Sequence, residues 1–595
     1  MDDRFVNPYT FVPLPKCGAK RSDCTAVTEP VFSGEIKCRL ITKTQIAVPD
    51  ILKNPVPDNV ERTEPKKYDF FTLDGKAAIP GSGIRGVIRS VYEVLTDSCM
   101  HLNEKDHLYT RLYKEKPGII TYDRGQNKYL LHESVRLRDK TGKIRRTGEK
   151  VRYFLYDAEE KKPEDLIKGY SPDGEKNGVY IHAGPFENSP NPSVFKYISS
   201  GKEIEEKYID CLIENVRMYE EKNAKDHKDT IKEEYESAIR EMKTNEGWLP
   251  VWYFYDRYTQ KYYFAPSQRS RAVFVNSLGD VVEKAGMMAC RKTNQCCATC
   301  ALFGFIGNKS DASDIRASHV RFTDAICENP DCFDGSFILP ILGEPKHSAF
   351  EFYLTGHNDR SFCPDNPDVT IAGRKFYWHA PQNVITSDNE KAKEQPTMAN
   401  RMQLVRNGEE FTFSVFYDRI TEDQLKKLVF ALNLGENYAS SSRCHKIGHG
   451  RPIGLGSVKI TVDSITKRSY ENGIYSVNDV TEEIVGAANA GMFPPTSEFI
   501  AFLTKVVNLN FVAKNNVHYP RTSQSTDIFA WFQKNRDLKR SRNYITIYNH
   551  LPRITDADQT LPVDPVPIQK NSSGRNHGGG FNKSHSGFQR KDYRR

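Results

Sequence analysis

The chain has 595 residues, 38% of them hydrophobic and 11% aromatic, so it is long enough to bury more than one core. Its formal net charge is +8, of which the segment from Lys570 onward contributes +6, so a nucleic-acid surface elsewhere must be a local patch. A run of 18 apolar residues and a signal-peptide pattern are both missing from the sequence, and we therefore expect a cytoplasmic protein with no membrane contact.

The first predicted element is a half-buried strand. Between Ser33 and Val48, apolar and polar residues alternate, as they do on a strand with one buried face. A polar, proline-broken loop follows from Asp50 to Tyr68, and long loops of this kind are often functional.

A glycine turn and a helix come next. The turn contains Gly81, Ser82 and Gly83, and apolar residues then recur at helical spacing from Ile84 to Leu95. A helix that begins on such a turn points free N–H groups and a positive dipole end outward, where a phosphate binds. Arg85 and Arg89 stand four residues apart on one side of this helix, which is also typical of a solvated basic face.

The sequence between residues 102 and 250 is highly charged. Lys202 to Lys243 predicts one or two surface helices, and we interpret the whole stretch as an insertion. The aromatic run from Trp252 to Tyr255 then predicts a strand.

A cysteine cluster follows. The 13 cysteines are unevenly spaced, which in an intracellular chain indicates metal before disulfides. Cys297 and Cys300 form a CxxC pair and Cys290 precedes it by seven residues, a spacing that suits three thiolates around a structural zinc ion. The alternatives for a replacement or fourth ligand are Cys296, Cys327, Cys332, His319, Cys99 and His101.

The end of the core repeats the pattern of its beginning. Phe411 to Tyr417 alternates as a strand, Thr421 and Gln424 form a capping box, and Leu425 to Leu432 gives a helical stripe. A second strand is predicted from Ser457 to Val462. Strand, helix and strand at both ends predict an α+β, ferredoxin-like fold whose halves are separated by insertions.

The loop before that last strand reads HKIGHGRPIGLGSVK. Gly448, Gly450, Gly454 and Gly456 permit positive φ and a close approach of the backbone to a ligand. Lys446 and Arg451 add positive charge and His449 a further donor, a combination that suits a phosphodiester backbone. The loop matches neither phosphate-binding nor dinucleotide motifs, so ATP and NAD sites are disfavoured.

These segments divide the chain into five regions. They are the first half of the core at 30–101, the insertion at 102–250, the second half of the core at 251–463, a helical C-terminal extension at 464–565 and a disordered, basic, glycine-rich tail at 566–595.

Four motifs in this order resemble the RAMP superfamily of CRISPR-associated proteins. They are FSGEIKCRLITKT, IPGSGIRGVIRSVYE, CATCALFG and KIGHGRPIGLGSVKI. More narrowly, these motifs resemble those of the backbone subunits of type III effector complexes, and the resemblance implies binding of CRISPR RNA and target RNA and assembly with other subunits.

The resemblance implies a modified RNA-recognition fold in which two segments hold the RNA backbone. The matching residues are Gly81, Ser82, Gly83, Arg85, Arg89, Lys446, Gly448, His449, Gly450, Arg451, Gly454 and Gly456. It also implies structural Zn2+ at the cysteines, and an aspartate after the first strand that cuts target RNA with Mg2+. Asp58 is the first choice because it lies mid-loop, with Asp50 and Asp69 as alternatives.

Two other functions remain open at this point. One is a metal-independent endoribonuclease that processes CRISPR RNA precursors, with His445 or His449 in general acid-base catalysis. The other is an RNA-binding protein unrelated to CRISPR.

Overall fold

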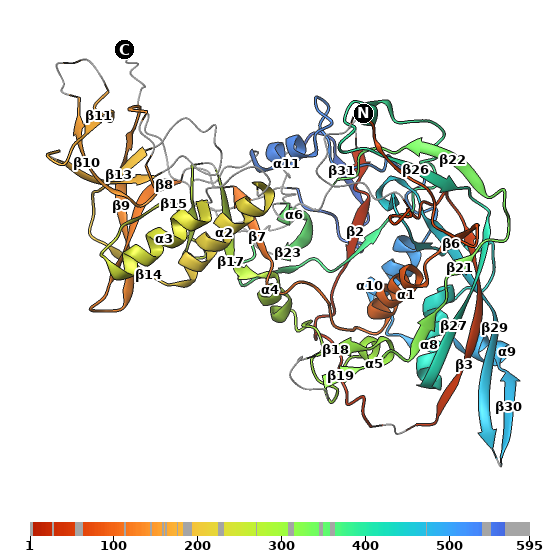
Figure 1. The fold of residues 1–595 in the computed structure, drawn as a ribbon. Helices are drawn as coiled ribbons and strands as arrows, with labels where there is room; N and C mark the ends of the chain where they lie inside the picture. The colour runs from red at the N-terminus through yellow and green to blue at the C-terminus, as the bar shows by residue number, and fades with distance from the viewer. Residues whose placement is uncertain are drawn as a thin grey trace, which may run out of the picture.

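The computed structural model describes residues 4–26, 29–53, 63–111, 115–142, 145–156, 160, 163–174, 176–181, 193–223, 231–268, 270–307, 314–343, 349–356, 363–471, 473–537 and 549–565. A larger part built around β3, β27 and β29 lies beside a smaller part with α2 and α3 (Figure 1). The predicted tail at 566–595 and Asp58 lie outside the described residues. Among the helices described, none is long and apolar enough to cross a membrane.

The larger part contains a nine-stranded sheet. Its main path runs β28 (His445–Lys446), β29 (Ser457–Glu471), β3 (Val31–Thr42), β27 (Glu410–Thr421), β21 (Ala325–Ile326), β6 (Lys76–Ile79) and β5 (Thr72–Leu73). Off this path, β20 (Val320–Phe322) pairs with β27 and β30 (Ile474–Asp479) pairs with β29. All of these pairings are antiparallel.

Two helices cover one face of this sheet. They are α1 (Gly81–Leu95) and α8 (Glu422–Asn433), whose apolar side chains share one core with β3, β27 and β29. Cys38 of β3 pairs with Phe413 on one side and Val462 on the other. The alternating pattern therefore turns Ile36, Cys38 and Leu40 toward the helices and leaves Lys37 and Arg39 exposed.

The predictions for this part are confirmed at the level of single elements. The strand expected from Ser33 to Val48 is β3, which ends at Thr42 and so is shorter than predicted, and the helix expected after the glycine turn is α1. The capping box on α8 is present, with Thr421 Oγ1 accepting from the Gln424 N–H and Gln424 Oε1 accepting from the Thr421 N–H. β29 continues past Asp463, where the sequence interpretation ended the core.

The segment from 102 to 250 differs from its sequence interpretation. The helices expected there are α2 (Lys207–Asn223) and α3 (Ile231–Thr244), but the segment also contains most strands of a second sheet. This second nine-stranded sheet contains β8 (Lys116–Asp123), β9 (Lys128–Arg138), β10 (Lys150–Leu155), β11 (Ile167–Tyr170), β12 (Lys176–Ile181), β13 (Ser193–Tyr197), β14 (Lys202–Ile204), β15 (Leu249–Asp256) and β16 (Lys261–Ala265). Charged residues lie on both faces of these strands, as Glu133 and Arg136 do on β9, so an alternation of apolar and polar residues is not evident in the sequence.

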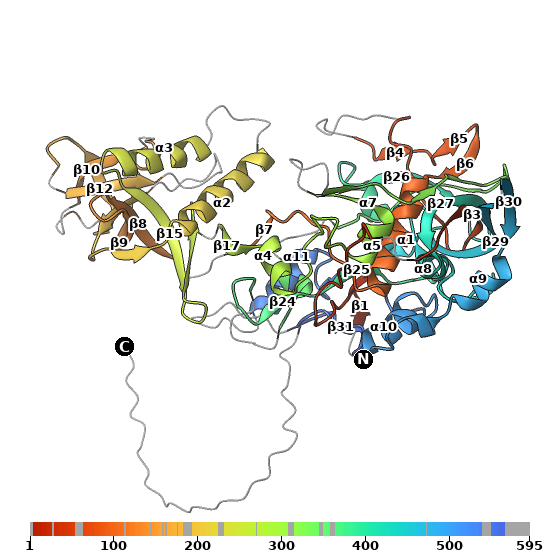
Figure 2. The same ribbon diagram turned by 90° about the horizontal axis from the view of Figure 1, so that it is seen from below.

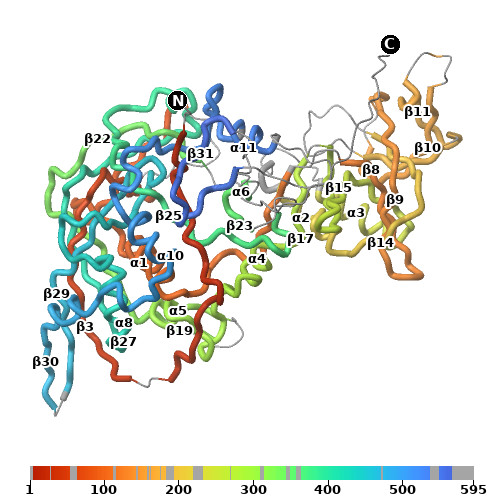
Figure 3. The backbone as a smooth tube through the Cα atoms, turned by 180° about the vertical axis from the view of Figure 1, so that it is seen from behind, coloured from red at the N-terminus to blue at the C-terminus, as the bar shows by residue number. Residues whose placement is uncertain are grey.

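Short elements complete the described chain. Paired strands are β1 (Arg4–Val6) with β31 (Thr560–Pro562), β2 (Tyr9–Val12) with β25 (Arg374–Tyr377), β7 (His107–Arg111) with β17 (Arg271–Ser277), β18 (Phe305–Ile306) with β19 (Ile315–Arg316), and β23 (Leu354–Gly356) with β24 (Val369–Ile371). A three-stranded sheet joins β22 (Phe333–Ile338), β26 (Asn400–Val405) and β4 (Lys66–Tyr68). The remaining α-helices are α4 (Leu278–Lys284), α5 (Ala298–Phe303), α6 (Phe350–Tyr353), α7 (Glu390–Lys393), α9 (Thr481–Ala487), α10 (Ser497–Ala501) and α11 (Ile528–Asp537). The β1–β31 pair places the two ends of the described chain together (Figure 3).

Candidate functional site

The glycine-rich loop lies between β28 and β29 and is folded tightly against its own neighbours. A short 3-10 turn, Arg451–Ile453, stands between Gly450 and Gly454, and these glycines have φ of 71° and 100°. A Cβ at Gly456 would lie 1.8 Å from the Ile447 carbonyl oxygen, and one at Gly448 would lie 2.5 Å from that of Ala47. Protein backbone therefore occupies the space beside these two glycines, where the sequence analysis expected a ligand.

Two lysines of the loop region point inward. Lys446 Nζ donates to the carbonyl oxygens of Gly454 at 2.8 Å and Leu455 at 2.7 Å, and burial lowers its pKa to about 7. Lys459 Nζ donates to the Asn433 carbonyl at 2.8 Å, and burial lowers its pKa to about 8. Both amines thus donate their hydrogen bonds to carbonyl oxygens of the protein, and these donors are not available to a phosphate.

The histidines are also largely enclosed. His445 is buried, its Nε2 lies 2.8 Å from the Leu432 carbonyl oxygen, and burial lowers its pKa to about 4. The backbone N–H of His449 donates to the Ala47 carbonyl at 2.8 Å, and burial lowers the pKa of its ring.

Arg451 differs from its neighbours in the loop. It is half-buried, and its guanidinium carbon lies 4.8 Å from the centre of the Tyr377 ring. Neither a carboxylate nor a carbonyl is paired with its guanidinium among the residues that the structure describes. Its donors are therefore available to an anion, with an aromatic ring beside them.

The start of α1 is partly closed by the protein. The Gly81 N–H donates to Asp324 Oδ1 at 2.6 Å, and the N–H groups of Gly83 and Ile84 donate to the Pro80 carbonyl. Ser82 and Gly83 are exposed, and a Cβ at Gly83 would meet nothing within 4 Å. The surface of the first turn is thus open, although Asp324 already takes one of its outward N–H groups.

Both arginines of α1 have partners within the protein. Arg85 Nη2 donates to the Phe303 carbonyl at 2.6 Å, and Arg89 Nε donates to Glu93 Oε1 at 3.0 Å. The start of α1 lies beside β21 and β6, whereas the glycine-rich loop lies at β28 and β29, with β3 and β27 between them. The sheet holds the two segments on one unit without bringing them into contact.

Two of the three aspartates predicted for catalysis are described. The Asp50 N–H donates to the Asp69 carbonyl at 3.0 Å, so the two residues are neighbours at the base of the loop that contains Asp58. Asp50 Oδ1 accepts from the N–H groups of Leu52 and Lys53, both at 3.1 Å. Asp69 Oδ1 lies 3.6 Å from Lys67 Nζ.

Four buried cysteines meet at the end of α1. The sulfur atoms of Cys99, Cys290, Cys297 and Cys300 all lie within 4.8 Å of one another. Cys99 Sγ lies 3.6 Å from the sulfur atoms of both Cys297 and Cys300. A tetrahedral zinc site with Zn–S bonds of about 2.3 Å has edges of about 3.8 Å, so this cluster has the size that such an ion requires.

Cys99 is the residue that the sequence spacing did not single out. It was one of several alternatives for the fourth position, because it lies far from the CxxC pair in the chain and reaches it only through α1. His101 Nε2 also lies 3.4 Å from Cys300 Sγ. Hydrogen bonds with the surrounding thiols lower the pKa of Cys297 and raise those of Cys99 and Cys300, because one thiolate is shared among neighbouring thiols.

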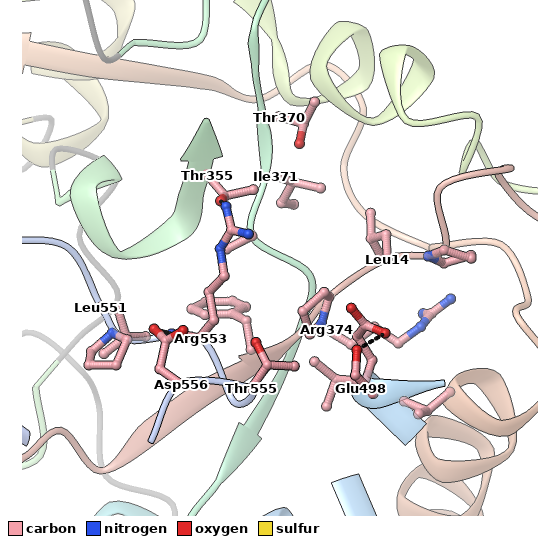
Figure 4. Close-up of a pocket in the computed structure, with 18 of the residues that line it drawn as sticks. Leu14, Thr355, Thr370, Ile371, Arg374, Glu498, Leu551, Arg553, Thr555 and Asp556 are labelled. Carbon is pink, nitrogen blue, oxygen red and sulfur yellow. Dashed lines mark hydrogen bonds between the residues drawn. The ribbon is translucent and has the colours of Figure 1, made fainter. Parts of the chain in front are cut away.

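A cavity of 1360 Å³ lies elsewhere in the molecule (Figure 4). Its walls come from the N-terminal segment, the end of α1, β23, β24 and the segment before β31. Two of its cations already have partners, because Arg374 Nη1 lies 2.8 Å from Glu93 Oε2 and Arg553 Nη2 donates to Thr355 Oγ1 at 2.9 Å. None of the residues predicted to be catalytic, RNA-binding or metal-binding lines this cavity.

A family model of the RAMP superfamily matches residues 39–459, which is more than half of the chain. The chain belongs to the RAMP superfamily. It is therefore a CRISPR-associated protein, as its four motifs predicted. The match begins inside β3 and ends inside β29, so it spans both halves of the core and the insertion between them.

A comparison with solved structures found the crystal structure of Csc2 from Thermofilum pendens, at 11% sequence identity. The pairing covers 71% of this chain and 77% of Csc2 with a TM-score of 0.14, which is too low to support an argument about fold or function. A search of curated proteins found no match.

The buried amine of Lys446 predicts a specific pH dependence of stability for this RAMP protein. At a pH between about 7, the lowered pKa of Lys446, and 10.5, its ordinary pKa, the amine is protonated in the unfolded chain and mostly neutral in the folded chain. Stability therefore rises with pH in this window, by at most about 1.4 kcal/mol per pH unit for one group. Lys446→Met should flatten that rise, measured as the difference in denaturation midpoint across the window.

The exposed Lys514 gives the matched control, since Lys514→Met should leave the slope unchanged. Lys459 contributes in the same direction to both variants. If the stability of the Lys446→Met protein rises with pH as steeply as that of the unaltered protein, the amine of Lys446 is charged in the folded chain and the prediction is wrong.

Proposed function

We propose that the chain is an RNA-binding subunit of a type III CRISPR interference complex, holding the backbone of CRISPR RNA on its core. The family match over residues 39–459 is the observation on which this proposal rests. We also propose that the chain is divided into the five regions predicted from the sequence, with the insertion between the two halves of one core.

The strand order supports an RNA-recognition type of core. In chain order the elements are β3, α1, β20 with β21, β27, α8 and β29. Across the sheet β29 lies next to β3, β3 next to β27, and β27 next to β20 and β21. This is the order that a ferredoxin-like fold with two split βαβ units produces.

Arg451 is the residue that we expect to contact the phosphate backbone from the loop. Its neighbours Lys446 and His445 are hydrogen-bonded to carbonyl oxygens of the protein, whereas Arg451 lies on Tyr377 and has no hydrogen bond or ion pair to the other residues described. On α1, the exposed Ser82 and Gly83 offer a surface that the backbone of an RNA strand can approach closely. The buried state of His445 removes it as the accessible base that a processing endoribonuclease needs, which leaves the half-buried His449 as the residue on which that alternative depends.

Arg451→Ala should weaken RNA binding to a similar extent for all sequences, because a phosphate contact does not depend on the base. The salt dependence of the binding constant should decrease by about 0.7, because one phosphate is no longer neutralised by the protein. Fluorescence anisotropy with labelled RNA at several salt concentrations measures both quantities. Arg419→Ala, which removes an exposed arginine paired with Asp418, is the matched control.

Sequencing of the RNA that copurifies from the native host separates the remaining alternatives. Repeat-derived RNA with a uniform 5′ end supports the CRISPR subunit. A heterogeneous mixture of cellular RNA, or equal affinity of the Arg451 variant and the unaltered chain, would contradict the proposal.

The cysteine cluster is proposed to hold a structural zinc ion. The four ligand atoms are sulfur, they are buried, and their spacing fits a closed tetrahedral site. The purified protein should contain about one equivalent of zinc by elemental analysis. Cys300→Ser should lose the metal and lower the thermal midpoint, while serine at the exposed Cys17 should change neither. Reduced protein that contains no metal would leave these thiols as core residues.

The proposed cleavage of target RNA remains tied to the loop after β3. Asp50 closes a turn with one oxygen and Asp69 lies beside Lys67, so Asp58 stays the first choice for a carboxylate that positions Mg2+ at the scissile phosphate. In the assembled complex, Asp58→Ala should abolish magnesium-dependent cutting and leave RNA binding intact. Full cutting by the Asp58, Asp50 and Asp69 variants alike would make the subunit a non-catalytic scaffold.

A further inference from the structure

The glycine-rich loop is held against the segment that follows β25. A Cβ at Gly454 would lie 2.6 Å from the Ala380 carbonyl oxygen, so the end of the 3-10 turn is in close contact with that segment. His379 Nδ1 lies 2.9 Å from the Oγ of Ser457, the first residue of β29. These contacts fix the position of the loop relative to β25, and Arg451 is the residue of the 3-10 turn that reaches this strand.

β25 carries a second cation beside the tyrosine that Arg451 contacts. Lys375 and Tyr377 are two residues apart on this strand, so their side chains leave the same face. Phe376 lies between them, points the other way and packs against Phe502. Lys375 Nζ lies 5.1 Å from the centre of the Tyr377 ring, and the Arg451 guanidinium carbon lies 4.8 Å from it. Because both distances are measured to one ring, the two cations are close neighbours.

The N-terminal segment holds Lys375 in this position. β2 pairs with β25 in a register that sets Tyr9 opposite Tyr377 and Phe11 opposite Lys375. Lys375 Nζ lies 4.1 Å from the centre of the buried Tyr9 ring, so its amine stands over two rings. The negative face of an aromatic ring attracts an ammonium group, and the pairing of β2 with β25 therefore determines where the charge of Lys375 stands.

The protein does not neutralise these two cations. Lys375 is exposed and Arg451 is half-buried, and in the described part of the chain neither side chain forms an ion pair or a hydrogen bond. The adjacent Arg374 gives the contrast, because its Nη1 lies 2.8 Å from Glu93 Oε2 and its Nη2 donates to the Cys99 carbonyl at 3.0 Å. β25 thus has one arginine that is bound within the protein and one lysine whose charge is available to an anion.

We propose that Lys375 binds the phosphate backbone of an RNA strand together with Arg451, as a pair of cations beside Tyr377. This rests on the proposed function, which assigns RNA to the core, and it adds a residue that lies outside the four motifs. Two neighbouring cations suit a ligand with neighbouring anionic groups, and a nucleic-acid strand has one phosphate at each nucleotide. Arginine binds a phosphate through two parallel N–H groups, and lysine binds it as a point charge. Because neither contact reads a base, the pair should bind RNA of any sequence.

The test measures binding of the full chain to labelled single-stranded RNA by fluorescence anisotropy at several salt concentrations. Lys375→Gln should lower the salt dependence of the binding constant by about 0.7, and the affinity at about 0.15 M salt about fourfold, because one phosphate is no longer neutralised. Combined with Arg451→Gln, the decrease in salt dependence should be about 1.4. Lys176→Gln is the matched control, since this exposed lysine lies on β12 in the smaller part, away from β25 (Figure 2).

Two further measurements separate the charge of Lys375 from a structural role. Lys375→Arg keeps the positive charge and should retain both the affinity and the salt dependence of the unaltered chain. Bound RNA should also protect Lys375 from acetylation by an N-hydroxysuccinimide ester, measured by mass spectrometry of the unaltered chain. Lys176 should react equally with and without RNA.

The outcomes distinguish this proposal from the one for the core. If Lys375→Gln binds RNA like Lys176→Gln while Arg451→Ala binds more weakly, the role of Lys375 is refuted and the proposed function stands. If neither the Lys375 nor the Arg451 variant differs from the control, both proposals fail. A Lys375→Arg variant as weak as Lys375→Gln would refute a role of the charge. A Lys375→Gln variant that keeps its affinity for RNA and loses affinity for polyglutamate would identify an acidic protein segment as the ligand and refute the RNA assignment.

Discussion

The structure depends on the two-sided pairing of β3. This strand is hydrogen-bonded to β27 along one edge and to β29 along the other, and its apolar residues lie between the two partners' apolar residues under α1 and α8. A shift of the register by one residue would turn Ile36, Cys38 and Leu40 to the exposed face, so the pairing and the core specify each other. The glycine-rich loop, α1 and the cysteine cluster all take their positions from elements attached to this sheet.

The sequence predicts what is local and misses what is distant. The capping box of Thr421 and Gln424 and the helix after Pro80 were predictable, because each depends on residues within one turn of helix. That Cys38 pairs with both Phe413 and Val462, or that Cys99 reaches Cys297 and Cys300, was not, because no local signal links residues so far apart. The strands of the insertion were not predicted for another reason. Their many charged residues conceal the alternation of a strand in the sequence, and only the register of the paired strands reveals it.

The glycine-rich loop shows the limit of reasoning from residue type. A glycine is needed wherever a backbone must pass close to another group, and the sequence cannot say whether that group is a ligand or the protein itself. Here Gly448 and Gly456 lie against carbonyls of Ala47 and Ile447, and the amine of Lys446 closes the loop from inside. What remains outward is Arg451 on its tyrosine, so the loop acts as a rigid support for one arginine.

The order of the strands along the chain determines when each strand can pair during biosynthesis. β3 leaves the ribosome early, but its two partners begin only at Glu410 and Ser457. At about 5–20 residues per second, this strand waits roughly 20 to 75 s with both edges unpaired. The insertion and its helices are synthesised during that interval, because every strand of their sheet ends by Ala265, well before β27 begins. We infer that the peripheral part folds before the core, and that the nascent chain must be shielded from aggregation at β3 meanwhile.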